Sequence, residues 1–334
     1  NLVKKMRASI LVLGPLLART GKAIVSLPGG CSIGLRPVDI HLKSLEKLGA
    51  KIFIEKGYIY AEALKGLKGN KIVFPKVSVG ATINILMAAV LAKGTTEIYN
   101  AAKEPEIEDL GLCLKSMGAK IQGLGTNKIL VEGVTKLKET NYKVMFDRIE
   151  AGTYALAVAI AGGEIELIGA EKKLLTFFLN VLESIGVQYI ITENSIVFKR
   201  HSNSLNPVDI ATEPYPGFPT DLQAQLMAVM AISNGTSVIT ENIFENRFMH
   251  APELIRMGAK IKLKNNLAIV EGVKKLKGAE VMATDLRASV SLVLAGLVAE
   301  GRTNISRTYH IDRGYQDIVK KLQFCGANIK RIAV

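Results

Sequence analysis

The sequence of 334 residues predicts an α/β fold of two domains, in which the most apolar helices are buried and the sheets lie outside them. Three observations predict this fold. One short phrase recurs about every seventy residues, and its glycines are Gly49, Gly118, Gly186, Gly258 and Gly326. A very apolar helix rich in small residues recurs between these phrases. The length itself favours two domains.

The recurring glycine is expected just after the end of a helix, where a left-handed residue costs little steric strain. The residues before it have helical spacing, as in Leu42, Leu45 and Leu48. The residues after it alternate in polarity or are β-branched, as at residues 52–54 and 128–131. Each phrase therefore predicts an exposed helix followed by strands, including a strand after Gly326.

Helices that are apolar on nearly every side are usually buried on every side. They are expected at residues 8–18, 82–92, 154–161, 226–232 and 289–299, each followed by a glycine and a strand. One full repeat is therefore strand, buried helix, strand, exposed helix, strand, strand. The first repeat begins at its buried helix, so we expect a further segment upstream of Asn1.

The polar stretch at residues 136–147 is the best candidate for a domain boundary. It separates two repeats from three, which gives a first domain at residues 1–145, missing its first unit, and a second at residues 146–334. A cleft between two such domains is where a ligand is expected.

Composition restricts the classes of ligand and compartment. Lys and Arg number 43 against 30 Asp and Glu, and this net charge of +13 favours anionic ligands. Trp is absent and aromatic residues make up 6%, which argues against base stacking on nucleic acid. Three widely spaced cysteines indicate a reducing, cytoplasmic compartment, with Cys113 and Cys325 expected in the core. No apolar run reaches the roughly 18–20 residues that span a membrane.

The starts of the buried helices are candidate anion sites, because free N–H groups and the positive end of the helix dipole meet there. Arg-Ala-Ser occurs at this point twice, beginning at Arg7 and Arg287. Arginine is unfavourable against the dipole, so an anion site explains these two residues better than capping does. Asp221 follows a stiff turn at residues 216–220 and is either an N-cap or a carboxylate directed at a substrate hydroxyl.

The loop at residues 28–39 has three glycines in six residues, which gives a mobile backbone with exposed amides. Cys31 lies in this loop and is a candidate nucleophile or proton donor. Arg36, Arg247 and Arg313 join the two arginines already named at the ends of repeats. The histidines and cysteines lack metal-ligand spacing and no nucleotide-binding glycine motif occurs, so we predict neither a metal nor a cofactor.

Eight motifs in this order resemble the family of enolpyruvyl transferases that act on UDP-N-acetylglucosamine. They lie at residues 6–9, 27–31, 36–39, 76–82, 218–221, 245–250, 283–289 and 309–315, across essentially the whole chain. The resemblance implies a two-domain inside-out α/β barrel, β-prism-like, with three βαβαββ units in each domain. One unit of the first domain would then lie upstream, together with the family's Lys-Asn pair and first strand. We expect the chain alone to be inactive or poorly stable, and active once that segment is supplied.

The resemblance also implies the chemistry. The enolpyruvyl group of phosphoenolpyruvate passes to the 3′-hydroxyl of UDP-N-acetylglucosamine and phosphate leaves, which is the first committed step of peptidoglycan synthesis. Cys31 supplies a proton, forms an adduct with phosphoenolpyruvate and is alkylated by fosfomycin, while Asp221 accepts the hydroxyl proton and Arg313 is the third catalytic residue. The implied substrate-binding residues are Arg7, Arg36, Pro37, Val38, Asp39, Ile40, Lys76, Val77, Ser78, Val79, Asp221, Ile243, Arg247, Asp285, Arg287 and Arg313.

Other functions stay open at this point. The sister transferase that acts on shikimate 3-phosphate shares the expected fold and phosphoenolpyruvate, although the Gly-Gly-Cys and Arg-Pro-Val-Asp segments fit the sugar-nucleotide enzyme. A truncated, non-catalytic paralogue would bind a nucleotide or another anion without turnover. A nucleic-acid binder is the weakest alternative.

Overall fold

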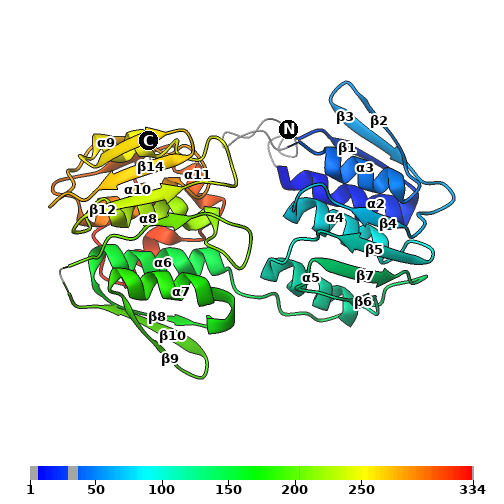
Figure 1. The fold of residues 1–334 in the computed structure, drawn as a ribbon, viewed down its shortest axis with the longest axis horizontal. Coiled ribbons are helices and arrows are strands. Elements are labelled where there is room, and N and C mark those ends of the chain that lie inside the picture. Colours follow the sequence, from blue (N-terminus) through cyan, green and yellow to red (C-terminus); the bar gives the residue numbers. More distant parts are fainter. Residues whose placement is uncertain (1–6, 29–36, 203, 333–334) are drawn as a thin grey trace. The chain divides into compact units, whose positions relative to one another are not determined.

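The computed structural model describes residues 7–28, 37–202 and 204–332. The chain divides into two compact units, the first ending at Met145 and the second beginning at Phe146 (Figure 1). Each unit has its own apolar core, which includes Leu13 and Ile85 in the first and Leu156 in the second. The assignment of these units to two enolpyruvyl-transferase domains, the first missing a repeat, stays a prediction.

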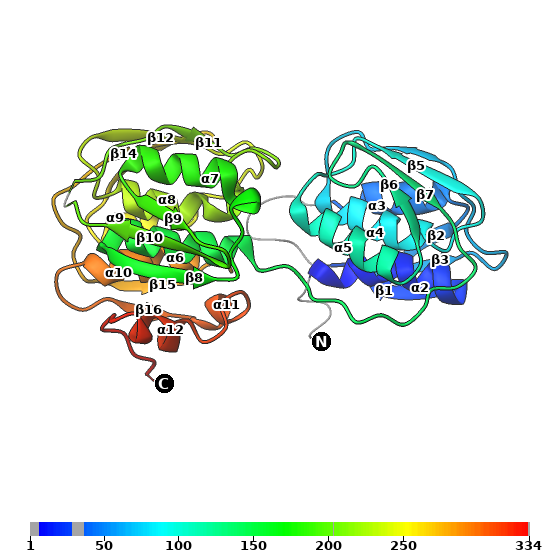
Figure 2. The same cartoon turned by 90° about the horizontal axis from the view of Figure 1, so that it is seen from below.

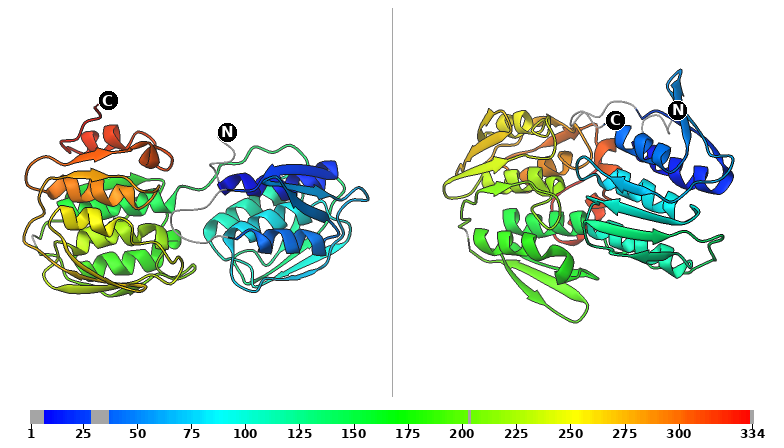
Figure 3. Two further views of the ribbon diagram at one scale, coloured as in Figure 1. Left: turned by 90° about the horizontal axis from the view of Figure 1, so that it is seen from above. Right: turned by 45° about the vertical axis from the view of Figure 1, so that its right-hand side comes forward.

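The buried helices form where the sequence is apolar all round, as predicted. Unit 1 contains α2 (Leu13–Thr20), which continues the 3-10 turn η1 (Arg7–Val12), and α4 (Val79–Ala89). Unit 2 contains α6 (Arg148–Ala161), α8 (Gln223–Met230) and α10 (Ser289–Val298). Each of these three helices contacts the other two, and every residue of α8 is buried. Figures 2 and 3 show the helices bordered by strands within each unit.

One glycine sets how closely α2 approaches α4. A Cβ atom on Gly14 would lie 2.3 Å from Asn84 Oδ1 and 2.4 Å from the Asn84 carbonyl oxygen. The Gly14 amide also donates to Asn84 Oδ1 at 2.7 Å. The two helices can therefore keep this spacing only because position 14 carries no side chain.

Gly14→Ala is expected to destabilise unit 1 by about 1–3 kcal/mol, because backbone atoms must move to admit the methyl group. The matched control is Gly296→Ala in α10, where the new Cβ would meet Thr303 at an ordinary 3.5 Å. That control is expected to stabilise by about 0.5–1 kcal/mol through helix propensity. Urea unfolding of both variants measures the difference, and equal midpoints would contradict the close packing of α2 on α4.

The exposed helices end as predicted at the five repeated glycines. They are α3 (Asp39–Lys47), α5 (Pro105–Ser116), α7 (Lys172–Ile185), α9 (Ala251–Arg256) and α12 (Ile318–Phe324). The five glycines have φ between 89° and 99°. In every repeat the residue after the glycine donates its amide to a leucine carbonyl five residues back, and these leucines are Leu45, Leu114, Leu182, Leu254 and Leu322. This bond satisfies a carbonyl at the helix end, and each leucine side chain is buried.

The strands form one sheet per repeat. In unit 1 the sheets are β1 (Lys22–Ser26), β3 (Tyr58–Glu62) and β2 (Lys51–Glu55), then β4 (Lys71–Val73), β5 (Thr95–Tyr99), β7 (Lys128–Glu132) and β6 (Lys120–Gln122). In unit 2 the first sheet is β8 (Gly163–Ile168), β10 (Ser195–Arg200) and β9 (Gln188–Ile191). The second is β11 (Ile210–Ala211), β12 (Thr236–Thr240), β14 (Leu267–Glu271) and β13 (Lys260–Lys264), and the third is β15 (Glu280–Met282) with β16 (Asn304–Ser306).

The strand before a buried helix pairs in parallel with the strand after it, as β4 with β5, β11 with β12 and β15 with β16. The remaining pairs are antiparallel. The predicted order of elements within a repeat is therefore confirmed where all six elements are present. The sheets of the first and third repeats have three strands among the described residues, without the leading one.

Two sequence expectations in the last repeat are wrong. Residues 327–332 form no strand, because a strand needs a hydrogen-bonded partner and no described segment pairs with them. Cys325 was expected in the core but is exposed, as is its neighbour Phe324. The apolar face of α12 packs through Ile318 and Leu322, whereas Cys325 is the C-cap beyond the last helical residue and is left exposed there.

Candidate active site

Three carboxylates mark the starts of the three buried helices of unit 2. Asp147 Oδ1 accepts the amides of Ile149 and Glu150 at 2.8 and 3.0 Å, so it caps α6. Asp285 Oδ1 accepts the amides of Arg287 and Ala288, both at 2.8 Å, just before α10. These two residues do what aspartate usually does at a helix start.

Asp221 differs from the other two. It lies in the 3-10 turn η2 (Thr220–Leu222) before α8, and its side chain caps no amide among the described residues. Its Oδ1 instead accepts a hydrogen bond from Arg247 Nη2 at 2.7 Å. The Asp221 side chain is 40% exposed, whereas that of Arg247 is 4% exposed. Asp221 is thus not an N-cap. The buried guanidinium of Arg247 holds the Asp221 carboxylate at the surface.

Besides Asp221, an aromatic ring and a buried histidine lie close to Arg247. Its guanidinium lies 5.5 Å from the ring centroid of Phe244. His250, three residues on, is fully buried. Burial, together with the charge of Arg247, lowers the pKa of His250 to about 3. His250 is therefore neutral at physiological pH, and it adds no charge that competes with the guanidinium.

The depressed pKa of His250 gives a testable pH dependence. Between the unfolded pKa of 6.5 and about 3 the unfolded chain binds this proton and the folded chain does not. The contribution of His250 to stability is therefore complete above pH 6.5 and is lost by about 1.4 kcal/mol per pH unit as the pH falls below it. His250→Phe, which has no titrating group, should lose less stability between pH 7 and pH 5 in urea unfolding. Identical pH dependence in the two proteins would show that His250 is not protonated on unfolding.

Arg287 has a partner that the sequence did not reveal. Its Nη2 lies 3.2 Å from Asp147 Oδ2, and its Nη1 donates to the Gly314 carbonyl at 3.4 Å. The guanidinium stacks 5.2 Å from the centroid of the buried Tyr315 ring. Burial opposes the charge of Arg287, but Tyr315, Asp147 and Asp221 together raise its pKa. The carboxylate of Asp147, the N-cap of α6, thus compensates the unfavourable dipole that Arg287 meets at the start of α10.

A hydrogen-bond network joins Asp221 to this arginine. Gln225 Nε2 donates to the Asp221 carbonyl at 2.9 Å, to Thr153 Oγ1 at 3.2 Å and to Tyr315 Oη at 3.3 Å. Tyr315 Oη also lies 3.0 Å from Thr153 Oγ1. The starts of α6, α8 and α10 are therefore connected through buried polar side chains, and Asp221 and Arg287 belong to one site.

The remaining predicted residues of unit 2 lie around this network. Asp285 Oδ2 is buried without a partner among the described residues. Ile243 is partly buried in the loop after β12, and its amide donates to Glu241 Oε1 at 2.9 Å. Arg313 follows α11 (Tyr309–Asp312), is exposed, and forms no ion pair with another described residue.

Residues 37–40 lie on either side of the start of α3 in unit 1. Pro37 and Val38 precede the helix, and Asp39, in its first turn, pairs with Lys43 at 3.5 Å. Ile40 is buried in the core of unit 1, so its side chain is a packing residue and only its backbone could meet a ligand.

Residues 76–79 precede and begin α4. Ser78 caps the helix by accepting the Ala81 amide at 3.3 Å, and no acidic residue lies in its first turn. Lys76 is exposed, and Val77 and Val79 are exposed apolar residues. This helix start suits an anion.

Cys31 and Arg36 lie outside the described residues, and for Arg7 only the backbone, at the start of η1, is described.

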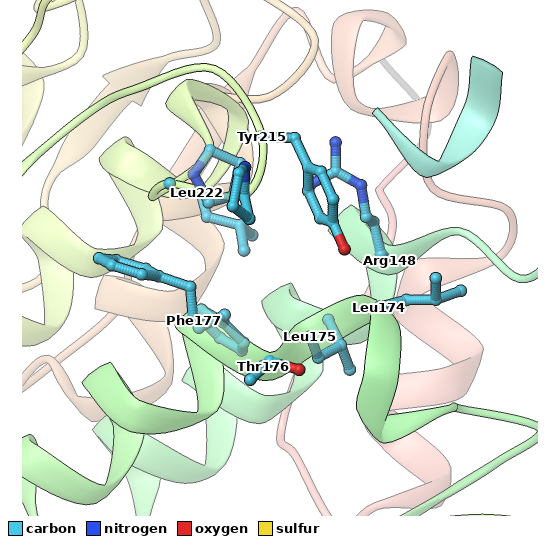
Figure 4. Close-up of a pocket in the computed structure, with 11 residues that line it drawn as sticks. Arg148, Leu174, Leu175, Thr176, Phe177, Tyr215 and Leu222 are labelled. Atoms are coloured by element: carbon cyan, nitrogen blue, oxygen red, sulfur yellow. The ribbon is translucent and has the colours of Figure 1, made fainter. Parts of the chain in front are cut away.

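A small cavity lies beside the turn that leads to Asp221 (Figure 4). Arg148, Phe177, Tyr215 and Leu222 are among its lining residues, and the Arg148 guanidinium lies 5.6 Å from the Tyr215 ring centroid. Its volume of about 30 Å³ corresponds to one water molecule rather than a nucleotide sugar. None of the predicted site residues lines it.

No group of three or more His, Cys, Asp or Glu side chains among the described residues could hold a metal ion. No helix of the described part is long and apolar enough to cross a membrane.

Relatives of known name match nearly the whole chain. The chain is 59% identical to the UDP-N-acetylglucosamine 1-carboxyvinyltransferase of Dinoroseobacter shibae, over 99% of this chain and 79% of that protein. It is 58% identical to the protein of the same name from Gluconobacter oxydans, over 100% of this chain and 79% of that protein. The family model described as EPSP synthase (3-phosphoshikimate 1-carboxyvinyltransferase) matches residues 1–322.

Solved structures agree on the fold. The enolpyruvyl transferase NikO from Streptomyces tendae superposes with a TM-score of 0.82 at 24% identity, over 96% of this chain and 76% of that one. The EPSP synthase of Acinetobacter baumannii superposes with a TM-score of 0.74 at 22% identity, over 99% of this chain and 79% of that one. The predicted fold class and the predicted family are thus confirmed. The chain belongs to the family of UDP-N-acetylglucosamine 1-carboxyvinyltransferases, within the wider group of enolpyruvyl transferases.

Proposed function

We propose that this protein transfers the enolpyruvyl group of phosphoenolpyruvate to the 3′-hydroxyl of UDP-N-acetylglucosamine and releases phosphate. The identity of 59% with relatives of that name is the observation that carries the proposal. The partly exposed Asp221 carboxylate, which is not used as a helix cap, supports it from the structure. A general base must be accessible and fixed in direction, and the Arg247 contact fixes this one.

In the proposed reaction the 3′-oxygen of the sugar attacks C2 of phosphoenolpyruvate while C3 takes a proton. Asp221 accepts the hydroxyl proton, and Cys31 supplies the proton to C3. The tetrahedral intermediate then loses a proton from C3 and phosphate from C2, which restores the double bond in the product. Clustered arginines stabilise the negative charge of both reactants, and we assign this role to Arg7, Arg36 and Arg313, with Arg247 and Arg287 as further arginines of the site.

Residues 36–40 and 76–79 are proposed to bind the uridine and the diphosphate, the latter at the open start of α4. Ile243, Arg247 and Asp285 are proposed to line the sugar and phosphate side in unit 2. The resemblance places Ile243 where valine is common, so the isoleucine would add one methylene group at the sugar.

The same proposal includes a biological role. The product would enter peptidoglycan and cell-wall biogenesis, and so cell shape, division and the cell cycle, in the cytoplasm. Fosfomycin would inhibit by alkylating Cys31, the residue proposed to carry the pyruvate adduct. No cofactor, metal or nucleic acid takes part in the proposed reaction.

Phosphate release from phosphoenolpyruvate tests the proposal, with the protein expressed from its complete gene. Release that requires UDP-N-acetylglucosamine and is lost in Cys31→Ser is the expected result. Release that depends on shikimate 3-phosphate instead would assign the sister activity. Binding of the UDP-sugar without turnover would identify a non-catalytic paralogue and overturn the proposal.

A further inference from the structure

Glu241 is a buried carboxylate that the proposed reaction does not use. It directly follows β12 and is 3% exposed. Buried carboxylates normally require a cation or several hydrogen-bond donors. Glu241 has no ion pair with a described lysine or arginine, and it accepts four hydrogen bonds instead.

These four donors come from three different segments. Thr212, which follows β11, donates its hydroxyl to Oε1 at 2.8 Å. The Ile243 and Phe244 amides, in the loop that leads to Arg247, donate to the same oxygen at 2.9 and 3.2 Å. The Thr220 hydroxyl donates to Oε2 at 2.9 Å, and Thr220 directly precedes Asp221.

Each oxygen of Glu241 therefore holds one side of the Asp221–Arg247 ion pair. Oε1 fixes the loop that carries Arg247, and Oε2 fixes the turn that carries Asp221. Hydrogen bonds to a carboxylate acceptor are shorter and stronger than hydrogen bonds between neutral groups. The four hydrogen bonds to Glu241, called here the junction, therefore hold the two segments firmly in place. We propose that Glu241 is a positioning residue, which acts through Thr220 and the loop at residues 242–247 to aim the Asp221 carboxylate. The proposal rests on the function proposed above.

Small displacements of a reacting group are costly, since a shift of about 1 Å can slow a reaction roughly a hundredfold. Losing the junction should therefore lower kcat, where Asp221 acts, more than it raises KM for the sugar nucleotide. Thr220→Val removes only the bond to Oε2 and keeps the shape of the side chain. Glu241→Ala removes the whole junction. Glu241→Gln keeps an acceptor for the two amides and, because a hydroxyl can also accept, a link to Thr220.

The test compares kcat, KM for UDP-N-acetylglucosamine and Tm across these variants. Thr220→Val is expected to lower kcat about tenfold with KM within threefold, and Glu241→Ala about a hundredfold. Glu241→Gln is expected to restore kcat to within about threefold of the parent protein. The control is Ser237→Ala, which removes a buried hydroxyl from the same strand, where it accepts the Val208 amide at 3.0 Å. Ser237→Ala should lower Tm as Thr220→Val does and keep kcat.

The outcomes separate this inference from the function on which it rests. Absence of UDP-sugar-dependent release in the parent protein would remove the proposed function itself. With the parent protein active, full kcat in Thr220→Val would overturn the role of Glu241 and leave the function standing. An equal fall of kcat in Ser237→Ala would also overturn it, because general loss of stability would then explain the effect.

Discussion

Asp221→Asn is expected to lower kcat about a thousandfold, the middle of the range for loss of a general acid or base. The amide has nearly the shape of the carboxylate and its oxygen can still accept the hydrogen bond from Arg247 Nη2. It cannot take the proton of the attacking hydroxyl at neutral pH. KM for UDP-N-acetylglucosamine should stay within a few-fold, because the lost interaction belongs to the transition state.

Steady-state phosphate release measures this effect, with Asp209→Asn as the control. Asp209 is an exposed aspartate whose side chain accepts the Val238 amide at 2.7 Å, away from the network around Asp221. The control should keep full kcat. Retention of more than about a tenth of kcat in Asp221→Asn would assign the proton to another group.

Arg247→Met is expected to lower kcat about a hundredfold while Tm stays the same or rises. The guanidinium is almost completely buried and its Nε has no hydrogen-bond partner among the described residues. Such a charge costs desolvation free energy, so an apolar side chain of similar length is often neutral or stabilising in its place. Asp221 is partly exposed and would be hydrated after the change, but its direction would no longer be fixed.

Parallel measurements of Tm and kcat distinguish this behaviour from simple unfolding. Arg256→Met, at the end of α9, is the control, because Arg256 is exposed and makes one long bond, 3.4 Å, to the Glu280 carbonyl. The Arg256→Met variant should change neither Tm nor kcat. A clear fall of Tm in Arg247→Met would show that the ion pair with Asp221 stabilises the fold rather than the reactive geometry.

The features that the sequence predicted best depend on local interactions. The five glycines were expected at helix ends because only the backbone conformation of one residue decides that role, and all five have positive φ. The buried helices were recognised because an apolar surface all round can only be accommodated in a core. The prediction of a strand after Gly326 was wrong, because a strand also depends on a partner strand that is distant in sequence.

The arrangement of the site depends on contacts between residues that are distant in sequence. The sequence therefore predicted which residue types would gather at the site, but not which residues would pair with one another. Asp147 and Arg287 are 140 residues apart, and nothing in either segment indicates their pairing. Capping was equally open to Asp147, Asp221 and Asp285, and only the fold shows that Asp221 is directed to Arg247 instead. Glu241 had no signal in the sequence, and His250 stood out only as part of the motif at residues 245–250, because the importance of both comes from burial that no local pattern encodes.

The long-range contacts of α6 have a consequence for the folding of unit 2 during its synthesis on the ribosome. Thr153 meets Tyr315 and Glu150 meets Lys321, which are separated by 162 and 171 residues. A ribosome adding about 5–20 residues per second needs on the order of ten seconds or more to complete the later partner of each pair. The side of α6 that these partners cover therefore stays uncovered until late in synthesis, and the cost of closing so large a loop predicts slow folding. Chaperone capture of nascent chains that end before Tyr315 is the expected sign of this delay.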